Sequence, residues 1–146
     1  MQTFLISENP KETAKILDNK RLGKQRVEAI QIANVLLDPS TSNAWKNHPA
    51  VLMWKGYEGL LIKVYLKEIM LEWINRGFKN EKCQQHYLRL CNVLEKRSIP
   101  VIKPVWFCKE IFDSHKSNLI RKNIEYYGKL WPNMTNNLPY VWPTKI

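Results

Sequence analysis

The chain has little cysteine, little glycine and few acidic side chains. It contains three cysteines and five glycines in 146 residues, and 13 Asp and Glu against 23 Lys and Arg. An odd cysteine count without a C-x-x-C pair argues against a disulfide framework and predicts free thiols in a reducing compartment. No run approaches the roughly 18 apolar residues that span a bilayer, and the chain start lacks a signal-peptide pattern. We therefore expect a soluble, cytoplasmic protein.

Several catalytic motifs are also missing. The sequence has no Walker motif, no G-x-S-x-G, no H-E-x-x-H and no carboxylate cluster typical of metal sites. Cys83 and His86 lie one helical turn apart, but no second pair completes a four-ligand zinc site. We therefore expect neither a metal nor a cofactor. Nucleotide hydrolysis, serine hydrolysis and two-metal nuclease chemistry all lose support.

The formal net charge of +10 is large for a chain of this size. Such a surplus of cations favours a polyanionic partner, with nucleic acid as the first candidate and an anionic membrane surface as the second. Hydrophobic residues make up 45% of the chain, which is ordinary for a folded domain and argues against disorder.

Helical periodicity dominates the chain, and strand signals are nearly absent. Gly56 and Gly59 predict a bend or a close backbone contact in the early part of one long helix. We expect an all-α fold, a compact and irregular helical bundle in which residues 1–146 form a single domain. The expected elements are helices at about 10–18, 24–37, 48–76, 81–96, 106–122 and 125–130, a corner at 19–23, a polar loop at 39–47 and an irregular tail at 132–146.

A basic helix start is the first candidate site. It carries Lys20, Arg21, Lys24 and Arg26 within seven residues, and helix N-termini already favour phosphate groups. Glu28 follows on the face of Lys24. A lone carboxylate among cations can stabilise a cationic sugar or act as a base. Equally, the cations can form a solvated basic face and Glu28 a surface ion pair with Lys24.

Three further segments combine polar donors or aromatic rings. In the segment 114–122, His115 can serve as an acid or a base, and its neighbours can contact phosphates or base edges; otherwise these residues form a helix surface or a buried histidine. The segment 126–131 alternates aromatics with a cation and suits either base stacking or core packing. Asn47 and His48, which precede Pro49, are polar candidates for DNA contacts; alternatively, they cap the helix that follows. The candidate DNA contacts in these segments are Asn47, His48, Lys116, Ser117, Asn118, Arg121, Lys122, Tyr127 and Lys129.

These residues carry a resemblance to a known family. The sequence resembles the pyrimidine-dimer DNA glycosylase/endonuclease V family, through its bacterial and viral branch. The shared motifs are R-L-G-K-Q-R-V-E-A at 21–29, N-H-P-A-V at 47–51, S-H-x-S-N-L-x-R-K at 114–122 and L-P-Y-V-W-P at 138–143. A looser similarity to the phage prototype lies at 72–78 and 126–129.

The resemblance implies an all-α protein that binds double-stranded DNA, flips a nucleotide out of the stack and excises a base. In the phage prototype of the family a free α-amine at the chain start attacks the sugar and forms a Schiff base, followed by strand cleavage. A bulky residue such as Gln2 normally blocks removal of the first methionine, so either Met1 supplies that amine or the amine is not catalytic. Arg21 stands where the family has its glutamate, and Glu28 is the nearest helical carboxylate.

The resulting hypothesis is a DNA glycosylase, with or without lyase activity, in which Met1, Arg21, Glu28 and His115 are the catalytic candidates. A pyrimidine dimer is the leading substrate, and other modified bases remain open. We expect a monomer that associates with nucleoid or viral DNA and has no membrane partner. The alternatives are a non-enzymatic basic DNA- or RNA-binding module and another nucleic-acid enzyme on the same scaffold.

Overall fold

The structure, a computed structural model, describes residues 1–38, 40 and 43–143. Within these residues every regular element is helical, which confirms the all-α expectation. No helix in the described part has both the length and the apolar character needed to cross a bilayer. The elements are α1 (Pro10–Ile16), α2 (Asn19–Leu37), the 3₁₀ turn η1 (Asn43–Trp45), α3 (Pro49–Leu52), α4 (Glu58–Leu60), the π-helical segment η2 (Leu61–Leu66), α5 (Lys67–Asn75), α6 (Glu81–Lys96), α7 (Lys109–Lys122) and α8 (Ile124–Leu130).

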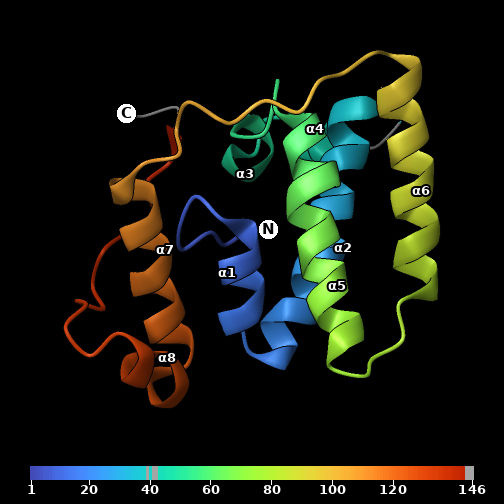
Figure 1. Ribbon diagram of the computed structural model, residues 1–146. Coiled ribbons are helices and arrows are strands. Elements are labelled where there is room, and N and C mark those ends of the chain that lie inside the picture. The colour runs from blue at the N-terminus through green and yellow to red at the C-terminus, as the bar shows by residue number, and fades with distance from the viewer. Residues whose placement is uncertain (39, 41–42, 144–146) are drawn as a thin grey trace.

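Helix α2 organises the bundle. It packs against η2, α5 and α6, and it also contacts α3 and α4. Helices α7 and α8 pack on each other and form the other side of the molecule (Figure 1). The chain start lies between these two groups, beside α1. A long, largely non-helical connection crosses from α6 to α7 over the top of Figure 1.

The hydrophobic core contains the beginning of the chain. Phe4 is 4% exposed and Leu5 is fully buried, among large side chains such as Trp54, Tyr65 and Tyr127. Chain termini are usually poorly ordered unless something ties them down. Here burial ties the N-terminal segment to the interior, so its backbone has a defined position.

Local capping signals explain where several helices begin. The Asn9 side chain accepts the N–H of Lys11, and Pro10 occupies the first turn of α1. His48 caps α3 in the same way, through a 3.0 Å bond from Ala50 N–H to its Nδ1. Pro10 and Pro49 each stand at the start of a helix, where the missing N–H costs nothing because the first N–H groups of a helix have no intrahelical partner.

The expected single helix over 48–76 is wrong. The chain forms α3, then turns without helix over 53–57, and resumes helically from α4 through η2 to α5. Gly56 has a φ of +90° in this break, a conformation that L side chains rarely adopt. A Cβ on Gly59 would lie 2.2 Å from the Pro100 carbonyl oxygen. The expected bend and the expected close backbone contact both occur.

Other boundaries also differ from the expectation. The corner expected at 19–23 is wrong: these residues form the first turns of α2, and the corner lies at Leu17 and Asp18. Gly23 lies inside α2, where a Cβ would come within 2.8 Å of the Trp73 ring, so this glycine allows close packing of α2 on α5. Helix α1 ends at Ile16, two residues before Asp18, and α7 begins at Lys109, three residues after the expected start. The helix expected at 81–96 is confirmed.

The two expected irregular segments are described only in part. The described tail, 132–142, is irregular as expected, and 144–146 lie outside the described residues. Residues 39, 41 and 42 of the expected polar loop also lie outside, and its later part forms η1.

Candidate active site at the chain start

The segment before α1 has no regular secondary structure, and side chains of other elements hold its backbone. Phe4 N–H donates to Gln25 Oε1 at 3.0 Å, and Gln25 Nε2 donates to the Gln2 carbonyl at 2.9 Å. Leu5 N–H donates to His115 Nδ1 at 2.9 Å. Buried backbone groups need partners. These side chains from α2 and α7 therefore fix the position of the first residues.

Glu28 lies directly beside the chain terminus. Its Oε2 accepts the Gln2 N–H at 3.0 Å and Gln25 Nε2 at 3.3 Å. Its Oε1 is 3.8 Å from Lys24 Nζ, so the expected pair exists. Glu28 is only 8% exposed, however, while the Lys24 side chain is 69% exposed. The carboxylate is therefore a buried group one residue from the α-amine of Met1, and not part of a solvated surface pair.

A pocket of about 390 Å³ opens beside this carboxylate. Four of its lining residues are cationic and one is anionic, so the pocket suits an anionic ligand with one electron-poor centre. The cations come from the first turns of α2 and from the end of α7. The lining residues are Met1, Gln2, Phe4, Lys20, Arg21, Lys24, Gln25, Glu28, Lys122 and Tyr140.

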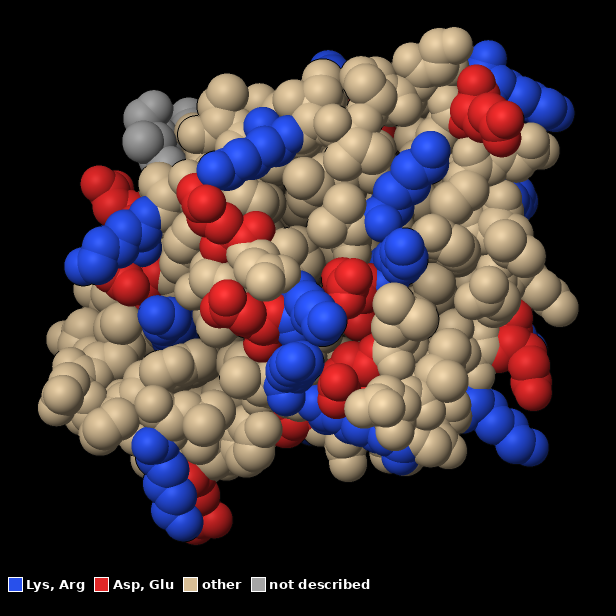
Figure 2. Space-filling view, in the orientation of Figure 1, with Lys and Arg blue, Asp and Glu red and all other residues tan. Residues whose placement is uncertain are grey.

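The net charge is not spread as one uniform patch on the face in view. Figure 2 shows basic and acidic side chains side by side over that face. The arrangement of cations around the pocket is therefore more informative than the total charge.

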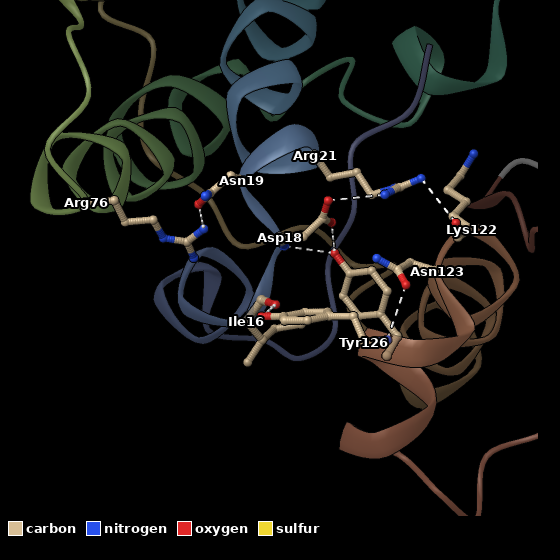
Figure 3. Close-up of polar contacts among 9 residues, drawn as sticks. Ile16, Asp18, Asn19, Arg21, Arg76, Lys122, Asn123 and Tyr126 are labelled. Atoms are coloured by element: carbon tan, nitrogen blue, oxygen red, sulfur yellow. Dashed lines mark hydrogen bonds and ion pairs between the residues drawn. The ribbon is translucent and has the colours of Figure 1, made fainter.

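Arg21 is held at the rim by a network at the α1–α2 corner (Figure 3). Its Nη1 lies 3.2 Å from Asp18 Oδ2, and its Nη2 donates to the Lys122 carbonyl at 3.5 Å. Asp18 in turn accepts from the Tyr127 hydroxyl, while its own N–H donates to that hydroxyl at 3.0 Å. Burial, the largest cause, raises the pKa of the Tyr127 hydroxyl. Tyr127 is fully buried and positions the corner of the pocket.

The same corner is joined to two further helices. The Tyr126 hydroxyl donates to the Ile16 carbonyl at 2.8 Å, and Asn123 caps α8 by accepting the Tyr126 N–H at 3.2 Å. On the other side, Arg76, the residue that follows α5, donates to Asn19 Oδ1 at 2.9 Å (Figure 3). The start of α2, which carries the cations of the pocket, is thus held from both sides.

His115 lies inside the core. It is fully buried, and burial lowers its pKa to about 4, so the ring is neutral at physiological pH. Its Nδ1 is occupied by Leu5 N–H, which places the proton on Nε2. His115 therefore holds the N-terminal segment through the Leu5 N–H and does not itself line the pocket.

The polar residues around His115 hold the tail. Ser117 is fully buried and Asn118 is 7% exposed. Ser117 Oγ accepts the N–H of Leu138 at 3.0 Å, and Asn118 Nδ2 donates to the Leu138 carbonyl at 3.2 Å. Arg121 Nη2 donates to the same carbonyl at 2.7 Å. These contacts hold the backbone of the C-terminal segment and use donors and acceptors that we expected to face DNA.

His48, the N-cap residue of α3, lies close enough to the chain terminus and to Glu28 for their charges to affect it. Partial burial is the largest cause that lowers its pKa, the positive charge of the chain terminus lowers it further, and Glu28 raises it. His48 is therefore within electrostatic reach of both groups. Its ring lies edge-on to Trp45 and Trp142, at centroid distances of 5.5 and 6.3 Å.

The remaining candidates are placed elsewhere. Arg26 stacks 4.1 Å from the Trp73 ring centre and donates to Asn80 Oδ1 at 2.9 Å, beside a second cavity of about 610 Å³ between α2 and α6. Lys116 lies 5.8 Å from the Trp131 ring centre. Asn47 and Lys129 are exposed and line neither cavity.

The sequence interpretation gave no site role to four residues that line the pocket, Gln2, Phe4, Gln25 and Tyr140. Gln25 bonds the backbone at two points and contacts Glu28, and its spacing of three residues from Glu28 could have revealed a shared helix face. Tyr140 lies in a motif that we quoted without giving it a role, and no local pattern predicts its place at the pocket. Within the described residues, no group of three or more His, Cys, Asp and Glu side chains is arranged to hold a metal ion.

Fold and site together define a class: an all-helical, basic protein with a carboxylate beside its chain terminus and cations around it. The comparison with protein families agrees. A family model described as pyrimidine dimer DNA glycosylase matches residues 1–85, and the chain belongs to that family. Its members are DNA glycosylases, and DNA is therefore the substrate that the family implies. No curated protein and no solved structure matches the chain.

Proposed function

We propose that this protein excises a damaged or modified base, with a pyrimidine dimer as the leading substrate, by using the α-amine of Met1 as a nucleophile and Glu28 as its acid–base partner. One observation carries the proposal: the buried Glu28 carboxylate accepts the Gln2 N–H at 3.0 Å. That bond places the carboxylate one residue from the amine. An α-amine is less basic than a lysine side chain, so a larger share is unprotonated at neutral pH.

The chemistry requires the nucleotide to leave the double helix. Inside a stacked duplex the sugar C1′ atom cannot reach a recessed amine, and flipping is the general solution. The cations at Lys20, Arg21, Lys24 and Lys122 suit the phosphates on either side of the flipped sugar. Arg21 is held by two partners, so its guanidinium is already oriented for such a contact.

The reaction then proceeds in two stages. The amine nitrogen forms a bond to C1′ as the bond from C1′ to the base nitrogen breaks. Glu28 stabilises the positive charge on the sugar, accepts the proton that the amine loses and passes it to the base nitrogen. In a pyrimidine dimer the base stays joined to its neighbour through the cyclobutane ring. Opening of the sugar ring gives an imine as the second amine proton moves to the ring oxygen. Removal of a C2′ proton then expels the 3′ phosphate and cuts the strand, which would make the protein a glycosylase and an abasic-site lyase.

The decisive experiment uses three labelled duplexes, one with a thymine dimer, one with an abasic site and one undamaged, each with and without borohydride. Borohydride reduces an imine to a stable covalent complex. We expect trapping on the first two duplexes and none on the third. Peptide mapping of the trapped complex should place the DNA on Met1, and intact mass should show that Met1 is retained.

Two variants with the same chemical change sharpen the test. Glu28→Gln should lower base excision by about 10²–10⁴-fold while duplex binding persists. Glu95→Gln, on the exposed side of α6, should leave both unchanged. Alkali-dependent cleavage without trapping would instead indicate a glycosylase that activates water. Binding to all three duplexes without any reaction would contradict the proposal and favour a DNA-binding module.

A further inference from the structure

The last part of the described chain runs back along α7 and is fixed to it. Figure 1 shows this segment, coloured red, beside α7 and α8. Val141 N–H donates to Ser114 Oγ at 3.3 Å, and Leu138 N–H donates to Ser117 Oγ at 3.0 Å. Arg121 also donates to the carbonyls of Asn136 and Leu138. One face of α7 therefore holds residues 136–141 in a single register.

The consequence of that register is the position of Tyr140. Its ring lies 6.3 Å from the Phe4 ring and 6.2 Å from the His115 ring, centre to centre, and 5.7 Å from the Trp142 ring. It also lines the pocket that contains Met1 and Glu28. A residue 139 positions from the chain start thus lines the same pocket as Met1.

Tyr140 differs from the other residues that line this pocket. Most of them are charged or polar, and the other aromatic ring, Phe4, is only 4% exposed. Tyr140 is partly exposed. Burial, the largest cause, raises the pKa of its hydroxyl, while Arg121 lowers it and Glu28 raises it again. At neutral pH the ring is therefore uncharged and presents an aromatic surface to the pocket.

We propose that Tyr140 stacks on the base that leaves the double helix, and so controls which bases are excised; this rests on the proposed function of the same pocket. A base that leaves a duplex loses its stacking neighbours, and an aromatic side chain replaces them. Because Tyr140 touches the base and not the sugar, it acts in base excision. In an abasic duplex there is no base for Tyr140 to stack on.

The test compares the two stages of the reaction on two substrates. The variants are Tyr140→Ala, Tyr140→Leu, which keeps apolar contact with the core but has no ring, and Tyr140→Phe. On the thymine-dimer duplex we expect single-turnover excision to fall about 10-fold or more in the Ala and Leu variants and to stay normal in the Phe variant. On the abasic duplex, borohydride trapping should stay within about 3-fold of the unsubstituted protein in all three.

Each other outcome overturns the inference. Equal losses on both substrates in folded variants, checked by thermal unfolding, would make Tyr140 a structural support of the pocket. No loss on either would remove it from the site, and a loss in the Phe variant would point to the hydroxyl instead of the ring. If the unsubstituted protein reacts with neither duplex, the proposed function itself fails, and the Tyr140 proposal fails with it.

Discussion

The buried His115 makes the stability of this protein depend on pH in a defined direction. In the fold its Nδ1 accepts the Leu5 N–H at 2.9 Å, and the ring is fully buried. A protonated imidazole carries hydrogen on both nitrogens and could no longer accept that bond. Protonation therefore favours the unfolded chain, and it also releases the segment that positions the α-amine.

The size of the effect follows from the two pKa values. The pKa of His115 is 6.5 in the unfolded reference and about 4 in the fold. Because the folded value is the lower one, the contribution to stability is complete above about pH 6.5 and is lost as the pH falls toward about 4. Between about pH 7 and pH 4.5 this histidine alone should remove about 2–3 kcal/mol from the free energy of unfolding.

Urea unfolding at the two pH values measures this loss. The matched variant is His115→Asn, because an amide oxygen can accept the Leu5 N–H but does not titrate in this range. Both proteins share all other titrating groups, so the difference between their losses isolates His115. We expect the unsubstituted protein to lose about 2–3 kcal/mol more than the variant. Equal losses in the two proteins would refute the placement of a neutral, buried imidazole at this position.

Three further predictions concern packing, charge and the corner network. Gly59→Ala should lower the free energy of unfolding by about 1–3 kcal/mol in urea, because its Cβ would meet the Pro100 carbonyl oxygen at 2.2 Å, whereas Gly128→Ala, whose Cβ has no contact closer than 3.7 Å, should not destabilise. Lys24→Gln should reduce the slope of log affinity for duplex DNA against log salt by about 0.9, one phosphate contact; an unchanged slope would place Lys24 away from the backbone. Tyr127→Phe removes a buried hydroxyl with two partners and should cost about 1–3 kcal/mol, read as a lower thermal midpoint.

Local signals predicted much of the helical framework. Asn9 followed by Pro10 starts α1 as its capping chemistry requires, and Gly77 follows α5 with a φ of +90°. Both boundaries of α6 coincide with those of the helix expected at 81–96. Such features depend on residues within one or two turns, so the sequence contains the information needed to predict them.

Boundaries that depend on distant contacts could not be predicted. Read locally, Gly23 predicts a helix break, yet it lies within α2. A glycine stands at this position because the Trp73 ring occupies the space that a Cβ would fill. Trp106 looks like the start of a helix but precedes α7, and its Nε1 donates to the Met53 carbonyl at 2.6 Å. In both cases the partner is about fifty residues away.

By itself, the sequence determined the all-α class, the surplus of cations, and the pairing of a carboxylate with a basic helix start at Glu28. These follow from periodicity and composition, which do not depend on tertiary contacts. Only the tertiary structure decided that Glu28 is buried against the chain terminus and that His115 holds the backbone instead of facing the pocket. It also decided that Tyr140 lines the pocket. The physical reason is that burial and hydrogen-bond partners come from segments up to 110 residues apart, and these meet only once the core has formed.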